Sequence, residues 1–263
     1  MNKFKKILFI LVFSILSVCV YAAEPFYFVQ ISDIHYGEPG ISAKMNKIID
    51  QINKLTFEVK AVIVTGDITM EKTLDIDTIA LCKKDFAKLK PTVYYLPGNH
   101  DILALSPKTL EPTRQAFERY FGPLAQKFEI NGVVFMLMYC EPWADNFKVA
   151  DYNPAEWLKT QLQKADKKPT LLFMHRAPSV ILSGNSFRKM WKAESLSELS
   201  DMTANANVKG IIVGHIHKDE LHYFGNIPIY TSGSVVHYAG RQATYKIFKY
   251  EDGKLSYFTR YIE

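Results

Sequence analysis

The feature that most constrains the fold is a repeated pattern in which an apolar, strand-like run ends at a short group of Asp, Asn, His and Gly residues. Three such groups occur in the first 101 residues: Asp33-Ile34-His35, Gly66-Asp67 and Gly98-Asn99-His100-Asp101. They are 34 (67 − 33) and 32 (99 − 67) residues apart, and one βαβ unit takes roughly 30 residues or more. Because binding sites in α/β sheets gather at the carboxyl edge, the three groups should lie together there.

Helix-like segments separate these runs, so the chain predicts an α/β fold. Apolar residues recur at helical spacing in 45–55 and 75–89, between the strand-like runs 26–31, 61–64 and 93–96. Further along, the sequence predicts a hairpin around Asn131-Gly132, a helix at 153–165, strands at 171–174 and 211–213, and hairpins around Gly225-Asn226 and Glu251-Asp252-Gly253. Residues 176–207 read as helix and loop without a strand, with Trp191 expected to be exposed.

Two later groups, His175 and Gly214-His215-Ile216-His217, place five of the seven histidines in such positions. We expect the other two, His222 and His237, to be surface or structural residues. Asp, Asn and His offer oxygen and nitrogen ligands suited to borderline divalent ions such as Mn, Zn or Fe. Each group alone is a weak signal, since a single Asp after a strand is usually a helix N-cap. Together they predict two metal ions, which can clamp an in-line displacement at phosphorus and supply a hydroxide at neutral pH.

The ordered segments SDIH, TGDIT, LPGNHD, MH and VGHIH resemble those of the calcineurin-like metallophosphoesterase superfamily. The similarity runs from about Phe26 to Tyr230. It implies a four-layer αββα sandwich, in which two mixed β-sheets are flanked by helices. Periodicity alone does not predict two sheets.

The resemblance also implies a role for each matching residue. Asp33, His35 and His217 would bind the first metal, Asp67 would bridge both metals, and Asn99, His175 and His215 would complete the second site. His100 would contact the phosphate or protonate the leaving oxygen as general acid. Asp101 would orient His100 by accepting a hydrogen bond from its ring N–H.

Two positions depart from better-known branches of the superfamily. Many of its cyclic-nucleotide phosphodiesterases carry a second His directly after the lone one, where this chain has Arg176. The purple acid phosphatases have a tyrosine ligand three residues after the bridging Asp, where this chain has Met70, so a charge-transfer Fe(III) site is not expected.

Three further residues are predicted to bind substrate. Arg176 and Arg188 can each hold a phosphate through a guanidinium group, and Trp191 can stack on a base or a sugar. The structural alternatives are that Arg176 caps a strand end and that Trp191 packs under the loop.

The N-terminus predicts export. Lys3, Lys5 and Lys6 precede an apolar run over 7–20 that ends in the small residues Ala22 and Ala23, and this is the pattern of a signal peptide. We expect a signal peptide at 1–22, a single domain at 23–263, a secreted or periplasmic location, and no stable membrane span after cleavage. An uncleaved anchor and lipidation at Cys19 are the alternatives.

The charge of the mature chain bears on its partners. Without the three N-terminal lysines it has 29 basic residues (32 − 3) and 27 acidic ones, a net charge of +2. This is not the concentrated basic face that nucleic-acid binding requires, so the expected partner is a small phosphoester. The predicted protein is a secreted phosphate mono- or diester hydrolase. The alternatives are a catalytically weak binding module of the same fold and a nuclease of the superfamily. A bridge between Cys82 and Cys140, the oligomeric state and the substrate stay open.

Overall fold

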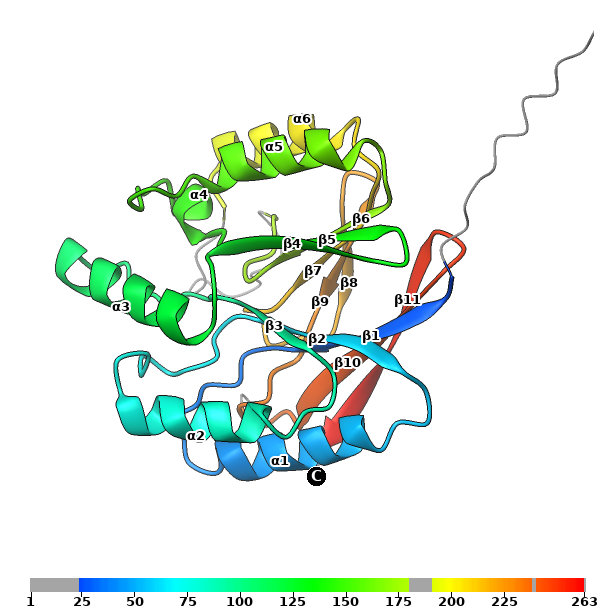
Figure 1. Ribbon diagram of the computed structural model, residues 1–263. Helices are drawn as coiled ribbons and strands as arrows, with labels where there is room; N and C mark the ends of the chain where they lie inside the picture. The colour runs from blue at the N-terminus through cyan, green and yellow to red at the C-terminus, as the bar shows by residue number, and fades with distance from the viewer. Residues whose placement is uncertain (1–23, 180–190, 238–239, 263) are drawn as a thin grey trace, which may run out of the picture.

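Two β-sheets pack face to face, and helices cover the outer face of each sheet (Figure 1). The structure is a computed structural model that describes residues 24–179, 191–237 and 240–262. The predicted signal peptide, Cys19 and Arg188 lie outside the described residues. The expected four-layer αββα sandwich of two mixed sheets is confirmed.

The first sheet has five strands in the order β11-β10-β1-β2-β3. β1, β2 and β3 are parallel, whereas β10 is antiparallel to both β1 and β11. The strands are β1 (Phe26–Ile31), β2 (Val59–Thr65), β3 (Val93–Leu96), β10 (Ala243–Glu251) and β11 (Lys254–Ile262).

The second sheet has six strands in the order β4-β5-β6-β7-β9-β8. Its four inner strands are parallel, and β4 and β8 are antiparallel edges. The strands are β4 (Ala125–Ile130), β5 (Val133–Met138), β6 (Thr170–Met174), β7 (Val208–Val213), β8 (Leu221–Phe224) and β9 (Ile227–Thr231).

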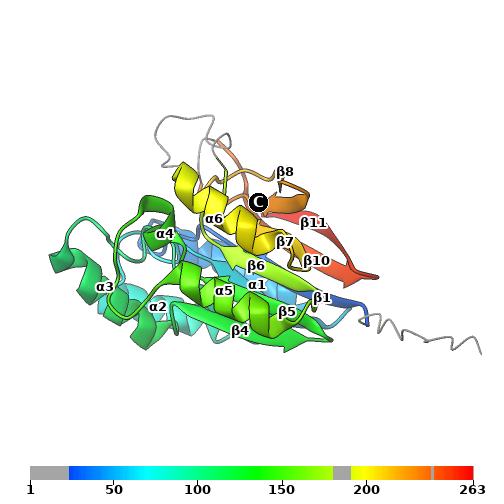
Figure 2. The ribbon, with the colours of Figure 1, turned by 90° about the horizontal axis from the view of Figure 1, so that it is seen from above.

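The helices form the two outer layers. α1 (Ile41–Asn53) and α2 (Ile76–Phe86) pack on the first sheet, and α5 (Pro154–Ala165) and α6 (Ala193–Thr203) cover the second (Figures 1 and 2). α3 (Pro107–Tyr120) adds Phe117 to the core of the first layer, and the short α4 (Glu141–Asp145) adds Trp143 to the core of the second.

Aromatic rings fill the space between the sheets. The ring of Phe28 stacks on Phe248 at 4.9 Å between centroids and meets Phe135 edge-on at 5.2 Å. All three side chains have no exposed surface. Truncating one such ring to Ala typically costs about 3–5 kcal/mol, so this layer fixes how the sheets sit on each other.

Two helices were absent from the sequence prediction. α3 carries Pro112 inside it and buries only Thr113 and Phe117, so it has few apolar residues by which a helix could be predicted. α4 is only five residues long, too short for a periodic signal. In the described part of the chain, no helix is long and apolar enough to cross a bilayer.

Cys82 and Cys140 are both free and buried. Cys82 belongs to the core under the first sheet and Cys140 to the core under the second. The bridge that the sequence left open is therefore not formed.

Candidate metal centre

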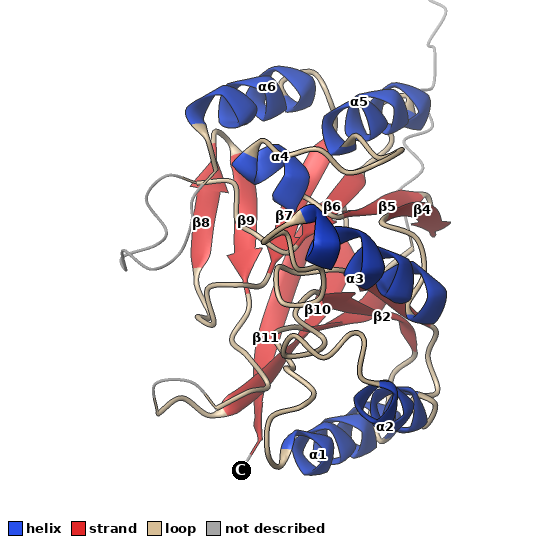
Figure 3. Ribbon diagram, turned by 90° about the vertical axis from the view of Figure 1, so that its left-hand side faces the viewer, coloured by secondary structure: helices blue, strands red, loops and turns tan. Residues whose placement is uncertain are grey.

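The predicted groups converge where β1, β2 and β3 of one sheet and β6 and β7 of the other end. Figure 3 looks onto this side of the molecule, where the loops that follow these strands gather. Each ligand follows its strand within one to four residues, so the direction of the strands brings the side chains together.

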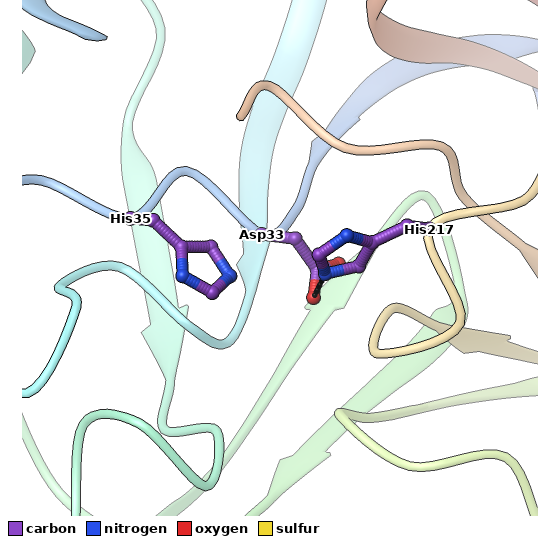
Figure 4. Close-up of side chains that lie close together, drawn as sticks. All are labelled: Asp33, His35 and His217. Atoms are coloured by element: carbon purple, nitrogen blue, oxygen red, sulfur yellow. Dashed lines mark ion pairs between the residues drawn. The ribbon is translucent and has the colours of Figure 1, made fainter. Parts of the chain in front are cut away.

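The first cluster is Asp33, His35 and His217 (Figure 4). One potential ligand atom from each residue lies within 4.8 Å of the others. Nε2 of His217 is 3.0 Å from Oδ1 of Asp33. All three side chains are buried. The structure therefore brings together the three residues that were predicted from sequence to bind the first metal.

The second cluster is Asp67, His175 and His215, again with ligand atoms within 4.8 Å. Oδ2 of Asp67 is 3.1 Å from Nε2 of His175 and 3.7 Å from Nε2 of His35, which belongs to the first cluster. The carboxylate of Asp67 therefore faces both clusters, as a bridging ligand must.

Both clusters draw on both sheets. Asp33 and His35 follow β1, whereas His217 follows β7; Asp67 follows β2, whereas His175 follows β6. The site exists only when the two sheets are packed on each other.

The donor set fits divalent metal ions. Nδ1 of His175 lies 2.8 Å from the carbonyl oxygen of Thr65. In the neutral ring, a hydrogen bond donated there keeps the proton on Nδ1 and turns an unprotonated Nε2 toward Asp67, the usual arrangement of a metal-binding His. Nε2 of His35 and Oδ1 of Asn99 are buried and have no hydrogen-bond partner among the described residues. Such atoms are expected to face an ion or water.

The electrostatics of the clusters favour ionised carboxylates. Burial by itself raises the pKa of Asp33 and of Asp67, but the neighbouring His217 and His175, respectively, hold both pKa values well below their usual range. Burial by itself lowers the pKa of His175, but the nearby Asp67 carboxylate raises it, and the net change is a rise. The pKa of His215 is lowered, first by burial and then by the neighbouring His175. The two carboxylates supply the negative charge that two cations require.

The backbone at the ligands is unusual. Asp33, His35, Asp67, His215 and His217 all have positive φ values, between 50° and 66°. Non-glycine residues pay roughly 1–2 kcal/mol each for this conformation, and such strain gathers at functional sites.

Gly214 is needed because of a close approach. A Cβ atom there would lie 1.9 Å from Oγ of Ser32 and 2.7 Å from Oδ2 of Asp33. Only glycine lets the loop after β7 reach the first cluster.

His100 lies at the mouth of the site, with a partly exposed ring. Its ring centroid is 5.1 Å from that of His35, and its backbone N–H donates to Oδ1 of Asp67 at 2.9 Å. Nδ1 of His100 is 3.5 Å from Oε1 of Glu71, a residue that the sequence analysis did not single out.

Asp101 has other partners than expected. Its carboxylate accepts hydrogen bonds from the backbone N–H groups of Ile68, Thr69 and Gly98 at 2.8–3.1 Å. None of the described hydrogen bonds joins it to the His100 ring. Asp101 therefore holds the loops that carry Asp67 and Asn99, and its expected contact with His100 is replaced by these bonds.

The clusters open into a cavity of about 690 Å³. Its lining includes four of the six cluster residues (His35, Asp67, His215 and His217), then Asn99, His100 and His237, and also Tyr139, Glu141, Asp145 and Arg176. Of Tyr139, Glu141, Asp145 and Arg176, the sequence predicted only Arg176 as a site residue. Glu141 and Asp145 lie in helix α4, which the sequence did not predict.

Arg176 pairs with acidic residues rather than standing free. Nη1 is 2.8 Å from Oδ1 of Asp145 and Nη2 is 2.9 Å from Oε2 of Glu141.

Trp191 was expected to be exposed, and this is wrong. It is 3% exposed and meets Trp143 edge-on at 5.3 Å between centroids. Its Nε1 lies 3.4 Å from the carbonyl oxygen of Arg176. It packs as a core residue, so its rings are not presented to the cavity.

Comparison with known proteins agrees with this geometry. The model of the calcineurin-like phosphoesterase family matches residues 26–219. A probable glycerophosphodiester phosphodiesterase from Arcobacter nitrofigilis is 27% identical over 80% of this chain and 78% of that protein. A probable cyclic nucleotide phosphodiesterase from Rhodococcus erythropolis is 21% identical over 81% and 72%.

Among solved structures, a dimetal phosphatase from Danio rerio superposes with a TM-score of 0.63 at 13% identity, over 90% of this chain and 99% of that one. This likeness concerns the fold. The family match covers most of the chain and includes the residues of both clusters, so the protein belongs to the calcineurin-like phosphoesterase family and is a metal-dependent phosphoric ester hydrolase.

Proposed function

We propose that the protein is an exported phosphodiesterase that uses two divalent metal ions, of Mn, Zn or Fe type, and His100 as general acid. One observation carries the proposal: the carboxylate of Asp67, a member of the second three-residue cluster, also lies 3.7 Å from Nε2 of His35 in the first, and both residues line an open cavity. Two ions bound there would activate a water molecule and neutralise charge on the phosphoryl oxygens.

The chain's own residues would divide the remaining work. Asp33, His35 and His217 would hold one ion, and His175, His215 and Asn99 the other, with Asp67 between them. His100, partly exposed at the cavity mouth, would donate a proton to the departing oxygen, because an alkoxide is a strong base. Glu71, whose Oε1 is 3.5 Å from Nδ1 of His100, would help to orient that ring.

The relatives support a diester rather than a monoester as substrate. Both relatives compared above are named as phosphodiesterases. The export part of the proposal is supported by the N-terminal sequence, with its three lysines and the apolar run 7–20.

A substrate panel tests the catalytic proposal. The chain from residue 23 onward would be assayed, with Mn, Zn or Fe and after chelation, on a phosphomonoester, a linear phosphodiester and a cyclic nucleotide. We expect the linear diester to be hydrolysed fastest, with activity lost on chelation and restored by metal. Faster turnover of the monoester would contradict the diesterase assignment. Cell fractionation and N-terminal sequencing of the full chain would test export and cleavage after Ala22.

A further inference from the structure

A second set of polar side chains lines the same cavity, beside the metal clusters. We name it the β5–α4 cluster: Tyr139, Glu141, Asp145 and Arg176. Tyr139 follows β5, Glu141 begins α4, and Arg176 directly follows the cluster residue His175. Tyr139, Glu141 and Arg176 are 0%, 2% and 5% exposed.

These three residues carry polar atoms that the fold does not satisfy. The hydroxyl of Tyr139, Oε1 of Glu141 and Nε of Arg176 are all buried and lack a hydrogen-bond partner among the described residues. Buried polar atoms are nearly always hydrogen-bonded to protein or to bound molecules. Three of them in one cavity wall indicate a ligand that supplies the missing bonds.

The charges of the β5–α4 cluster disfavour binding of a further phosphate group at this cluster. The guanidinium of Arg176 is paired with both Glu141 and Asp145, so one positive charge faces two carboxylates. An anionic group placed there would meet net negative charge. The predicted phosphate-binding role of Arg176 is therefore not supported by its surroundings.

The unsatisfied atoms instead match hydroxyl groups. Nε of Arg176 can only donate, Oε1 of an ionised Glu141 can only accept, and the hydroxyl of Tyr139 can do both. An alcohol with adjacent hydroxyl groups donates and accepts in the same way. A simple alkyl chain would leave all three protein atoms unpaired, and sites of this kind discriminate strongly against such analogues.

We propose that the β5–α4 cluster is a subsite for a polyol, and that one ester branch of the substrate carries adjacent hydroxyl groups which bind Tyr139, Glu141 and Arg176. The inference rests on the proposed function, since it places a branch of the same phosphodiester.

Two matched diesters test the subsite. Glyceryl p-nitrophenyl phosphate and propyl p-nitrophenyl phosphate have the same leaving group and the same number of alcohol carbons, and they differ only in two hydroxyl groups. We expect the metal-loaded enzyme to prefer the glyceryl ester by roughly tenfold or more in kcat/KM. Tyr139→Phe should reduce this preference by several-fold through KM and leave the propyl ester nearly unchanged.

Tyr250→Phe is the matched control. The Tyr250 hydroxyl is also buried and unpartnered, but Tyr250 lies in the core between the sheets and not in the cavity. This variant should keep the preference. A general effect of losing a buried hydroxyl would appear in both variants, whereas a subsite effect appears only in Tyr139→Phe.

A binding measurement separates the two proposals. Calorimetry would compare glycerol 3-phosphate with propyl phosphate on the metal-loaded protein. Tighter binding of glycerol 3-phosphate that Tyr139→Phe removes would support the subsite even if neither diester were hydrolysed, and only the diesterase proposal would then fail. Two results would overturn the subsite. One is equal binding of the two phosphates together with equal kcat/KM for the two diesters, and the other is an equal loss for both compounds of a pair in Tyr139→Phe.

Discussion

The metal clusters and the β5–α4 cluster share one cavity but are built in different ways. The seven predicted metal ligands follow parallel strands within a few residues, and five of them sit on left-handed backbone, so their positions follow from strand direction. The β5–α4 cluster depends on Arg176, after β6, meeting Glu141 and Asp145 in a helix more than 30 residues earlier. The predicted metal-binding residues thus occur in short sequence motifs, whereas the residues suited to substrate specificity are brought together by packing between distant segments.

The largest effect should come from the residue that joins the two metal clusters. In Asp67→Asn the carboxylate that we propose bridges the two ions loses a charged oxygen. Changes to residues that only support metal ligands cost roughly 10–100-fold, so this variant should lose more than about 100-fold in activity together with bound metal. Elemental analysis and turnover would be measured on the same sample. Two ions per chain with normal turnover would contradict the bridging role.

His100 should separate chemistry from metal binding. His100→Asn removes the proposed proton donor, a role that typically contributes roughly 10²–10⁴-fold, and should retain both ions. The loss should be smaller for a p-nitrophenyl ester, whose leaving group needs no proton. His222→Asn, in a His that pairs with Glu220 away from the cavity, is the control. A parallel fall in metal content would identify His100 as a ligand.

Asp101 should act through the loops that it holds. Asp101→Asn places an amide N–H among three backbone N–H donors, so the loops after β2 and β3 should loosen. We expect roughly a 10–100-fold loss of metal affinity, read by competition with a chelator, with activity restored at high metal concentration. Asp151→Asn, at an exposed left-handed position, should change nothing. An activity loss that metal cannot restore would instead favour a direct role through His100.

Trp191 should have the smallest effect on catalysis. Since it is buried against Trp143, Trp191→Phe should lower the free energy of unfolding by about 1–3 kcal/mol through imperfect packing, and should leave KM within about twofold. Denaturant unfolding and steady-state kinetics would be compared with Trp157→Phe, a half-buried residue of α5. A raised KM with unchanged stability would return Trp191 to the substrate-binding residues.

These cases mark how far the sequence alone leads. Strands β1, β2 and β3 and the residues after them could be predicted, because apolar runs and their polar ends are local signals. The residues that a side chain contacts in the folded protein can lie far away in the sequence, so local patterns do not reveal them. The sequence could not show that Asp101 turns toward backbone N–H groups of the loop after β2, or that Trp191 is buried against Trp143.

The origin of each metal cluster in both sheets has a consequence for how the molecule comes apart. An ion held by Asp33 and His217 would tie together points 184 residues apart in the chain (217 − 33). It would act as a reversible cross-link that closes a very long loop, the kind for which the lost chain entropy of the unfolded state is largest in theory. The unfolding temperature should then rise with the concentration of free ion, so the protein would be most resistant to heat in surroundings rich in its metals.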